Sequence, residues 1–546
     1  MDSKYKEQRQ LRISQMCRIP KLLVFLLAAF YMFFLSETYR AAASVTAGEA
    51  TVSCKDSANT LRKKKSEPEK KTKPKKNADD VAAVREIIRT QTGASVSRDL
   101  NDTAQYTWTN IGKESRLTRI EWPKKELQGE LSFSGLPQLE YLDIQTGQLT
   151  GLDISKNTAL KYLDCSFQQL ETLDISTNKA LETLKCDKNR LKELKVQNNL
   201  ALTQLSCSRN QLTSLNLKKN AALKELNCEA NQLTSLKLNG NPALTQLSCS
   251  SNELKSLSIS GIQALAYLDC SYNRLTKLDM AKNTVLAYLN CSFNSIKKLD
   301  LSGIKALEEL YCSRNNLSGL DLQKNKALKK LVCSENRLTD LALRKNTQLE
   351  TLDCAGNRLT ELDIRKNKTL SSLHCDSNRL TALNVNANTA LTNLRCSSNA
   401  LTQLDIRANQ ALTEVSCDRN NLTELTVNTN AALKVLTCTH NELTRLRVDA
   451  APALEALDCS YNKLTELDIH ANEALQGLNC QANQLRVLDI RTNPNLETLF
   501  CQENQLQNID VSANPVLTVL YHDKDVEITG GDGQQEDVED TEETEE

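Results

Sequence analysis

Apolar and polar positions follow one pattern that returns every 21 residues along most of the chain. The unit from Leu181 to Asn199 shows the order L-x-x-L-x-C-x-x-N-x-L, with polar residues in most of the gaps. Within it, Leu184, Lys185 and Cys186 alternate between apolar and polar, which is typical of a short strand with one buried face. A fixed period of this length predicts a solenoid in which each repeat forms one coil.

Seventeen cysteines mark the same position of successive repeats, from Cys165 to Cys501, without insertion or deletion. We expect each of them to be a small buried apolar residue that lies above the next one, as a cysteine ladder. Disulfides between neighbouring coils are not expected, because in-register β-carbons lie about 4.8 Å apart and disulfides need about 3.8 Å. The row also lacks the C-x-x-C spacing of zinc ligands, so it predicts packing and no metal site.

Asparagine follows sixteen of these cysteines by three residues, and Gln168 takes its place in the first repeat. We expect this amide to satisfy free backbone groups where the chain leaves the strand. A second row of asparagines, from Asn157 to Asn514, marks the opposite turn. The segment between the two turns is short and rich in threonine and β-branched residues, which predicts an extended or 3₁₀ convex side.

The pattern continues beyond the cysteine row at both ends. Ile144 and His522 take the cysteine position one repeat before and one repeat after it, and an opening strand fits between Leu117 and Trp122. The fold class predicted is therefore an α/β solenoid, rich in β-structure and curved, with about 20 parallel-strand coils. At about 4.8 Å per strand, its sheet would be roughly 90 Å long.

The predicted organisation has five parts. Terminal coils need a cover, and Asp79 to Arg89 has the apolar spacing of an amphipathic helix that would supply an N-terminal helical cap. The parts are a signal peptide at 1–47, a basic disordered linker at 48–77, the cap at 78–116, the solenoid at 117–522, and a C-terminal end with an acidic disordered tail at 523–546.

Basic and acidic residues are equal in number, 68 of each, but a basic cluster lies at residues 62–76 and an acidic cluster at residues 530–546. At the N-terminus, basic residues precede the apolar run Leu22 to Leu35 and then small residues, the order of a secretion signal cleaved near residue 43 or 47. The run is short for a membrane span, and an uncleaved membrane anchor is the alternative. Either way the repeats are expected outside the cell, secreted or on the cell surface.

A basic stretch follows the signal. We predict that it attaches the protein by charge alone to an anionic wall polymer or to lipid headgroups, with a solvated spacer as the alternative. Its basic residues are Arg62, Lys63, Lys64, Lys65, Lys70, Lys71, Lys73, Lys75 and Lys76.

Aromatic residues make up only 4% of the chain, yet five of them fall in three neighbouring repeats. They occupy concave-facing strand positions and the strand exit, and rigid aromatic surface with polar neighbours is typical of binding hot spots. The alternative is repetition of a duplicated unit, with the strand-exit aromatics packed as edge cover. Phe500 and Tyr521 are a smaller candidate, which we assign to the end cap. The predicted ligand-binding residues are Tyr267, Tyr272, Tyr288, Phe293, Tyr311, Glu308, Glu309 and Lys330.

Catalysis is not indicated. The four histidines lie in separate repeats, so they supply neither a metal-ligand pair nor a nucleophile–base set. A glycine-rich phosphate loop is also missing from the sequence. We therefore expect no enzyme activity, no cofactor, no metal and no nucleic-acid partner.

Units such as LEELYCSRNNLSGLDLQKNKA and LTNLRCSSNALTQLDIRANQA resemble the 21-residue cysteine-containing repeats of bacterial surface leucine-rich-repeat proteins of the internalin type. The resemblance covers about residues 140–522. It implies a secreted or wall-attached protein whose concave face binds a protein or glycan on a host or bacterial surface, as an adhesion module. An L-P-x-T-G sorting signal is not found, so covalent wall attachment is not expected. The alternative function is a structural cell-surface spacer or surface-layer component without a specific ligand.

Overall fold

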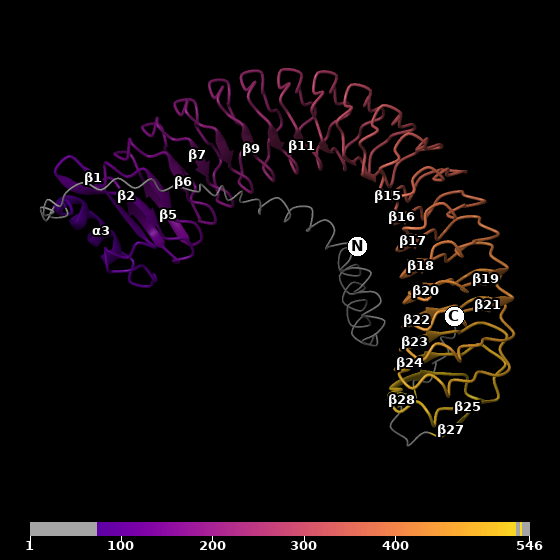
Figure 1. Ribbon diagram of the computed structural model, residues 1–546. Helices are drawn as coiled ribbons and strands as arrows, with labels where there is room; N and C mark the ends of the chain where they lie inside the picture. Colours follow the sequence, from indigo (N-terminus) through magenta and orange to yellow (C-terminus); the bar gives the residue numbers. More distant parts are fainter. Residues whose placement is uncertain (1–73, 531–535, 538–546) are drawn as a thin grey trace, which may run out of the picture.

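The computed structural model describes residues 74–530 and 536–537. They form a curved stack of coils whose main sheet lines the concave side, while turns and short strands form the convex side (Figure 1). The main sheet has 22 strands. The predicted solenoid of about 20 coils is therefore confirmed, and a strand is added at each end. No helix in the described ranges is long and apolar enough to cross a lipid bilayer.

The N-terminal cap consists of α3 (Ala78–Thr90), β1 (Tyr106–Ile111) and β2 (Glu114–Glu121). The helix begins after Asn77, whose side chain accepts a hydrogen bond from the Asp80 amide at 3.0 Å. The buried Asp80 carboxylate then binds Arg116 at 2.7 Å and so ties the helix to β2. Because β1 pairs antiparallel with β2, it covers the edge that the first parallel strand would expose.

The remaining strands of the main sheet are parallel, and most are three residues long because a turn lies on either side. Their bounds are β4 (Tyr141–Asp143), β6 (Tyr162–Asp164), β7 (Thr183–Lys185), β8 (Gln204–Ser206), β9 (Glu225–Asn227), β10 (Gln246–Ser248), β11 (Tyr267–Asp269), β12 (Tyr288–Asn290), β13 (Glu309–Tyr311), β14 (Lys330–Val332), β15 (Thr351–Asp353), β16 (Ser372–His374), β17 (Asn393–Arg395), β18 (Glu414–Ser416), β20 (Val435–Thr437), β22 (Ala456–Asp458), β23 (Gly477–Asn479), β24 (Thr498–Phe500), β26 (Val519–Tyr521) and β28 (Glu536–Asp537).

Three further strand pairs lie outside the main sheet. They are β3 (Gln128–Ser132) with β5 (Gln148–Asp153), β19 (Glu424–Thr426) with β21 (Arg445–Arg447), and β25 (Asn508–Asp510) with β27 (Glu527–Thr529). Elsewhere the convex side of the described coils is made of turns and extended chain. The two residues of β28 lie in the acidic tail that was predicted as disordered, and they join the sheet by backbone pairing with β26.

Asparagines hold each coil to the coil before it, as their spacing predicts. The Nδ2 of Asn315 donates to the carbonyl oxygens of Cys291 at 3.0 Å and Cys312 at 3.2 Å. Its Oδ1 accepts from the Ile296 amide at 2.9 Å. Gln168 forms the equivalent hydrogen bond in the first repeat, because its longer side chain donates to the Ile144 carbonyl. The substitution at that position therefore keeps the function of the row.

The seventeen cysteines of the row are free thiols and are buried. Desolvation raises their pKa, to about 12 for Cys228 and Cys291. Such thiols carry almost no thiolate at neutral pH and are unreactive. Several donate weakly to the following coil, as Cys438 does to the Asp458 carbonyl at 3.6 Å. The row thus packs the interior, as predicted.

Candidate binding surface on the concave face

Three tyrosines form one continuous column across β11, β12 and β13. Tyr267 and Tyr288 occupy the same register on paired strands, and their ring centroids are 4.3 Å apart with planes at 10°. The Tyr311 ring follows at 5.4 Å from Tyr288, tilted by 42°. All three side chains are half-buried, and desolvation raises the pKa of Tyr267 to about 12. The column is therefore rigid and uncharged at neutral pH.

A second aromatic pair lies at the strand exit of the same coils. Tyr272 and Phe293 are stacked at 3.9 Å, and the Arg314 guanidinium lies 4.9 Å from the Phe293 ring. Their φ angles are 50° and 55°, a left-handed conformation that non-glycine residues adopt only at a cost. Tyr272 remains 48% exposed. The structure thus brings the five predicted aromatics together as two stacks, one on the strands and one on the exit turn.

The predicted charged neighbours separate into two groups. Glu309 accepts a hydrogen bond from the Tyr311 hydroxyl at 2.9 Å, and the Lys330 ammonium lies 5.3 Å from the Tyr311 ring. Both residues therefore belong to the tyrosine column. Glu308 instead forms a salt bridge with Lys329 at 2.8 Å, before the strand begins. It lies beside the column and does not contact the rings.

A tyrosine pair near the N-terminal cap was not predicted. Tyr141 on β4 and Tyr162 on β6 are stacked at 4.1 Å with planes at 5°. The Arg119 guanidinium lies 3.3 Å from the Tyr141 ring, and the Lys185 ammonium lies 5.7 Å from the Tyr162 ring. The pair was missed because Tyr141 precedes the cysteine row. Reading the position three residues before each cysteine through all coils would have found it.

The basic stretch is described only from residue 74 onward. Lys76 contacts the cap: its ammonium donates to Asn101 at 2.8 Å and lies 4.7 Å from the Trp108 ring. The Lys75 carbonyl accepts from the Ser115 amide at 2.9 Å. These two residues therefore help to hold the chain against the cap. The other predicted attachment residues, from Arg62 to Lys73, lie outside the described residues, as does the predicted signal segment.

The concave face has a different character between β16 and β20. His374 contacts Asn393 at 3.1 Å, and Asn393 donates to Glu414 at 2.6 Å. Glu414 also forms a salt bridge with Arg395 at 2.8 Å. Burial raises the pKa of the neighbouring Asp376 to about 6, although a hydrogen bond from the Ser397 amide and the charge of Arg395 both act to lower it. Polar side chains in this half therefore bind mainly one another.

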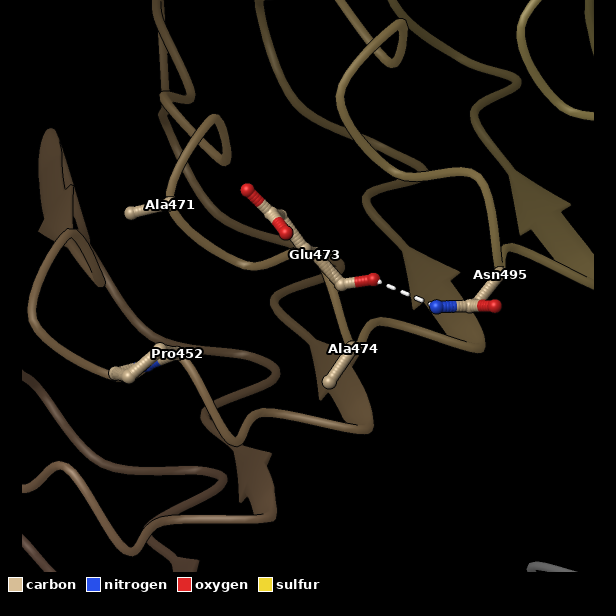
Figure 2. Close-up of a pocket in the computed structure, with 5 residues that line it drawn as sticks. All are labelled: Pro452, Ala471, Glu473, Ala474 and Asn495. Carbon is tan, nitrogen blue, oxygen red and sulfur yellow. Dashed lines mark hydrogen bonds between the residues drawn. The ribbon is translucent and has the colours of Figure 1, made fainter.

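An open depression lies on the turns that lead into β22, β23 and β24 (Figure 2). Its lining contains one carboxylate, Glu473, whose main-chain oxygen accepts a hydrogen bond from Asn495 at 3.0 Å. It is lined otherwise by Pro452, Ala471 and Ala474. Within residues 74–530, no three His, Cys, Asp or Glu side chains converge as metal ligands. The depression therefore has a single ionisable side chain in its lining.

Comparison with known proteins agrees with the coil geometry. A family model described as leucine-rich repeats (2 copies) matches residues 326–367. Among solved structures, the functional domain of InlJ from Listeria monocytogenes, which includes a cysteine ladder, is 35% identical with a TM-score of 0.56. The match covers 59% of this chain and 72% of that domain.

Two further structures share the fold. A leucine-rich-repeat protein of Leptospira interrogans is 24% identical with a TM-score of 0.53, over 63% of this chain and 91% of that chain. The plant peptide hormone receptor RGFR1, in complex with RGF2, is 21% identical with a TM-score of 0.65, over 74% and 80%. No curated protein matches the sequence. The 21-residue coil, the cysteine row and the similarity to InlJ show that the chain belongs to the leucine-rich-repeat proteins of the internalin type.

Proposed function

We propose that the protein is a non-catalytic recognition module outside the cell, which binds a macromolecular ligand on its concave face in adhesion. The tyrosine column on β11, β12 and β13 carries this proposal, because it places three rigid, half-buried rings on an open sheet. Aromatic side chains lose little conformational entropy on binding and dominate the affinity of many interfaces. A long parallel sheet also offers area to a large partner and no enclosed pocket for chemistry.

Export is part of the same proposal. The basic, apolar and small-residue order of residues 1–47 supports it, together with membership in the internalin type. Attachment through Arg62 to Lys73 to an anionic wall polymer is proposed on charge alone. Release of the protein from isolated cell walls by salt tests that attachment, since retention at high salt contradicts it.

The test of the binding proposal uses residues that the chain itself carries at the same register. Tyr288→Thr copies Thr351, and Tyr311→Asn copies Asn290, so the double variant keeps the coil sequence within its natural range. The full chain is used as bait for a biotinylated extract of cell-surface proteins and for a glycan array. Phe500→Asn, which copies Asn479, is the matched control outside the column.

We expect the double variant to lose retained partners about tenfold or more, and the control to keep them. Equal retention by the double variant and the control contradicts the column as the site. If neither proteins nor glycans are retained by the native chain, the structural spacer is the better description.

A further inference from the structure

The concave position three residues before the cysteine forms a continuous line of side chains along the first half of the sheet. In-register pairing of β4 through β12 places them side by side. A tyrosine pair stands at each end of the line, and hydroxyl, amide and carboxylate groups fill the middle. The residues in order are Tyr141, Tyr162, Thr183, Gln204, Glu225, Gln246, Tyr267 and Tyr288.

We propose that this line binds an extended, positively charged peptide segment of a protein partner, which crosses the strands and contacts a tyrosine pair at each end. The proposal rests on the concave recognition function above and names the chemistry of its ligand. Seven strand spacings of about 4.8 Å make a line of roughly 34 Å. An extended peptide of about ten residues, at about 3.3 Å per residue, spans it.

The packing of the rings favours a peptide over a sugar. Tyr141 has Arg119 on one face and Tyr162 on the other. Tyr288 likewise lies between the rings of Tyr267 and Tyr311. Sugars bind aromatic residues by stacking on an open ring face, whereas both faces of Tyr141 and of Tyr288 are covered by neighbouring side chains. The rings offer apolar contact area to side chains at the two ends of the segment, and the polar groups between the two pairs suit peptide N–H and C=O groups.

Charge favours a basic segment. Along β4 to β12, the concave-facing positions before and after the cysteine hold six carboxylates and one lysine, Lys185. The carboxylates are Asp143, Asp164, Asp187, Glu225, Glu229 and Asp269. The salt bridges described for acidic residues of these coils involve other residues, such as Glu140, Glu193 and Glu253. The face therefore has an excess of negative charge that a cationic ligand complements.

Burial adds to this argument. Desolvation raises the pKa of Asp164 and Asp269, which are half-buried or buried and are hydrogen-bonded by serine residues. It also raises the pKa of Glu229, which Arg209 opposes only in part. A Lys or Arg side chain of a bound segment would stabilise the ionised forms that burial disfavours. Binding of this kind weakens as salt increases.

The probe is a pair of synthetic libraries of peptides about twelve residues long, with an apolar residue near each end. One library has Lys or Arg at its central positions, and the other has Asp or Glu. The full chain is immobilised at low and at physiological salt. We expect the basic library to be enriched about tenfold over the acidic one, with lower enrichment at the higher salt. Equal enrichment of the two libraries overturns the proposal.

A selected basic peptide is then measured on two double variants, Tyr141→Thr with Tyr162→Thr and Tyr267→Thr with Tyr288→Thr. Threonine is native at this register at Thr183 in the same line, so both variants are expected to fold. Each double variant should bind the peptide with about tenfold lower affinity, and Phe500→Asn should bind it as the native chain does. If only the Tyr267 and Tyr288 variant loses affinity, the extended track is wrong and the recognition function stands. If neither variant loses affinity, the peptide track fails, and retention of surface proteins and glycans by the Tyr288→Thr, Tyr311→Asn variant decides the recognition function separately.

Discussion

The two halves of the concave face differ in chemistry although one interior runs beneath both. From β4 to β13 the face carries two tyrosine columns, and its carboxylates accept hydrogen bonds from uncharged neighbours, as Asp187 does from Ser206 and Glu225 does from Gln204. From β16 to β20 it carries polar networks such as Glu414 with Arg395 and Asn393. In both halves the leucines, cysteines and asparagines below are buried in the same positions.

This contrast shows how a repeat fold separates stability from recognition. Each coil contacts mainly its two neighbours, so the interior must repeat while the outward strand positions are free to vary. A short run of coils can then acquire aromatic residues without disturbing coils further along. Substitutions in the interior are therefore expected to have equal effects in the two halves, and substitutions on the surface are not.

The largest effect is expected from the asparagine row, and it should be equal in the two halves. Asn231 donates to the Cys207 carbonyl at 3.0 Å, and Asn420 donates to the Cys396 carbonyl at 3.1 Å. Their Oδ1 atoms accept from the buried Leu212 and Leu401 amides. Asn231→Leu and Asn420→Leu should each lower the free energy of unfolding by about 3–5 kcal/mol, because buried backbone groups lose their partners.

Chemical denaturation of the two variants measures this loss, with hydrogen exchange of the Leu212 and Leu401 amides as a local readout. An exposed convex change, Lys237→Ala, is the control and should have little effect. A difference of more than about 2 kcal/mol between the two asparagine variants would show that the halves do not share one interior.

A pH-dependent effect is expected in the second half. The pKa of Asp376 is about 6 in the folded chain, above about 3.9 when unfolded, so the folded state holds the proton more tightly. Its stabilising contribution is present below pH 4 and is lost as the pH rises through 6. Asp376→Asn should therefore gain up to about 3 kcal/mol over the native chain between pH 4 and pH 7. The measurement is chemical denaturation of both proteins at pH 4 and pH 7. A difference in unfolding free energy between variant and native chain that is the same at the two pH values contradicts this prediction.

The coil itself was predictable because its period is free of insertions. The spacing of the cysteines and asparagines fixed the register, the buried face and the turn at which each amide binds. The action of Gln168 was not predictable, because only the structure shows its longer side chain reaching the Ile144 carbonyl. The same holds for β28, whose pairing uses backbone groups that no side-chain pattern reveals.

The candidate site was predictable in part. The concentration of tyrosines in a chain poor in aromatics pointed to Tyr267, Tyr288 and Tyr311 before their stacking was known. Glu309 lies three residues before Cys312, at the concave-facing position, whereas Glu308 lies one residue earlier, so the register of the repeat already distinguishes the two. Tyr141 was missed because it stands in a coil with isoleucine at the cysteine position.

A smaller effect is expected from the cysteine row, again equal in the two halves. Cys228 and Cys438 are both buried, and each donates weakly to a carbonyl of the next coil at 3.6 Å. Replacing either by serine places a strongly polar hydroxyl in an apolar interior and should cost about 1–2 kcal/mol. Thermal or chemical unfolding measures the cost, and Cys→Ala at the same positions separates polarity from lost volume. A cost above about 1 kcal/mol at one position alone is the contradicting result.

The smallest effect on stability is expected where the effect on binding is largest. Tyr288→Thr removes a stacked ring from a half-buried position and should lower the free energy of unfolding by less than about 1 kcal/mol. The reciprocal change Thr351→Tyr, at the same register on β15, should shift it by a similarly small amount and confer no affinity for the basic peptide. Thr351 lies on β15, outside the tyrosine columns, and the next residue of that strand on the concave face is Asp353. If Thr351→Tyr alone creates binding, affinity depends on having a tyrosine anywhere on the sheet, and the contrast between the two halves has no functional meaning.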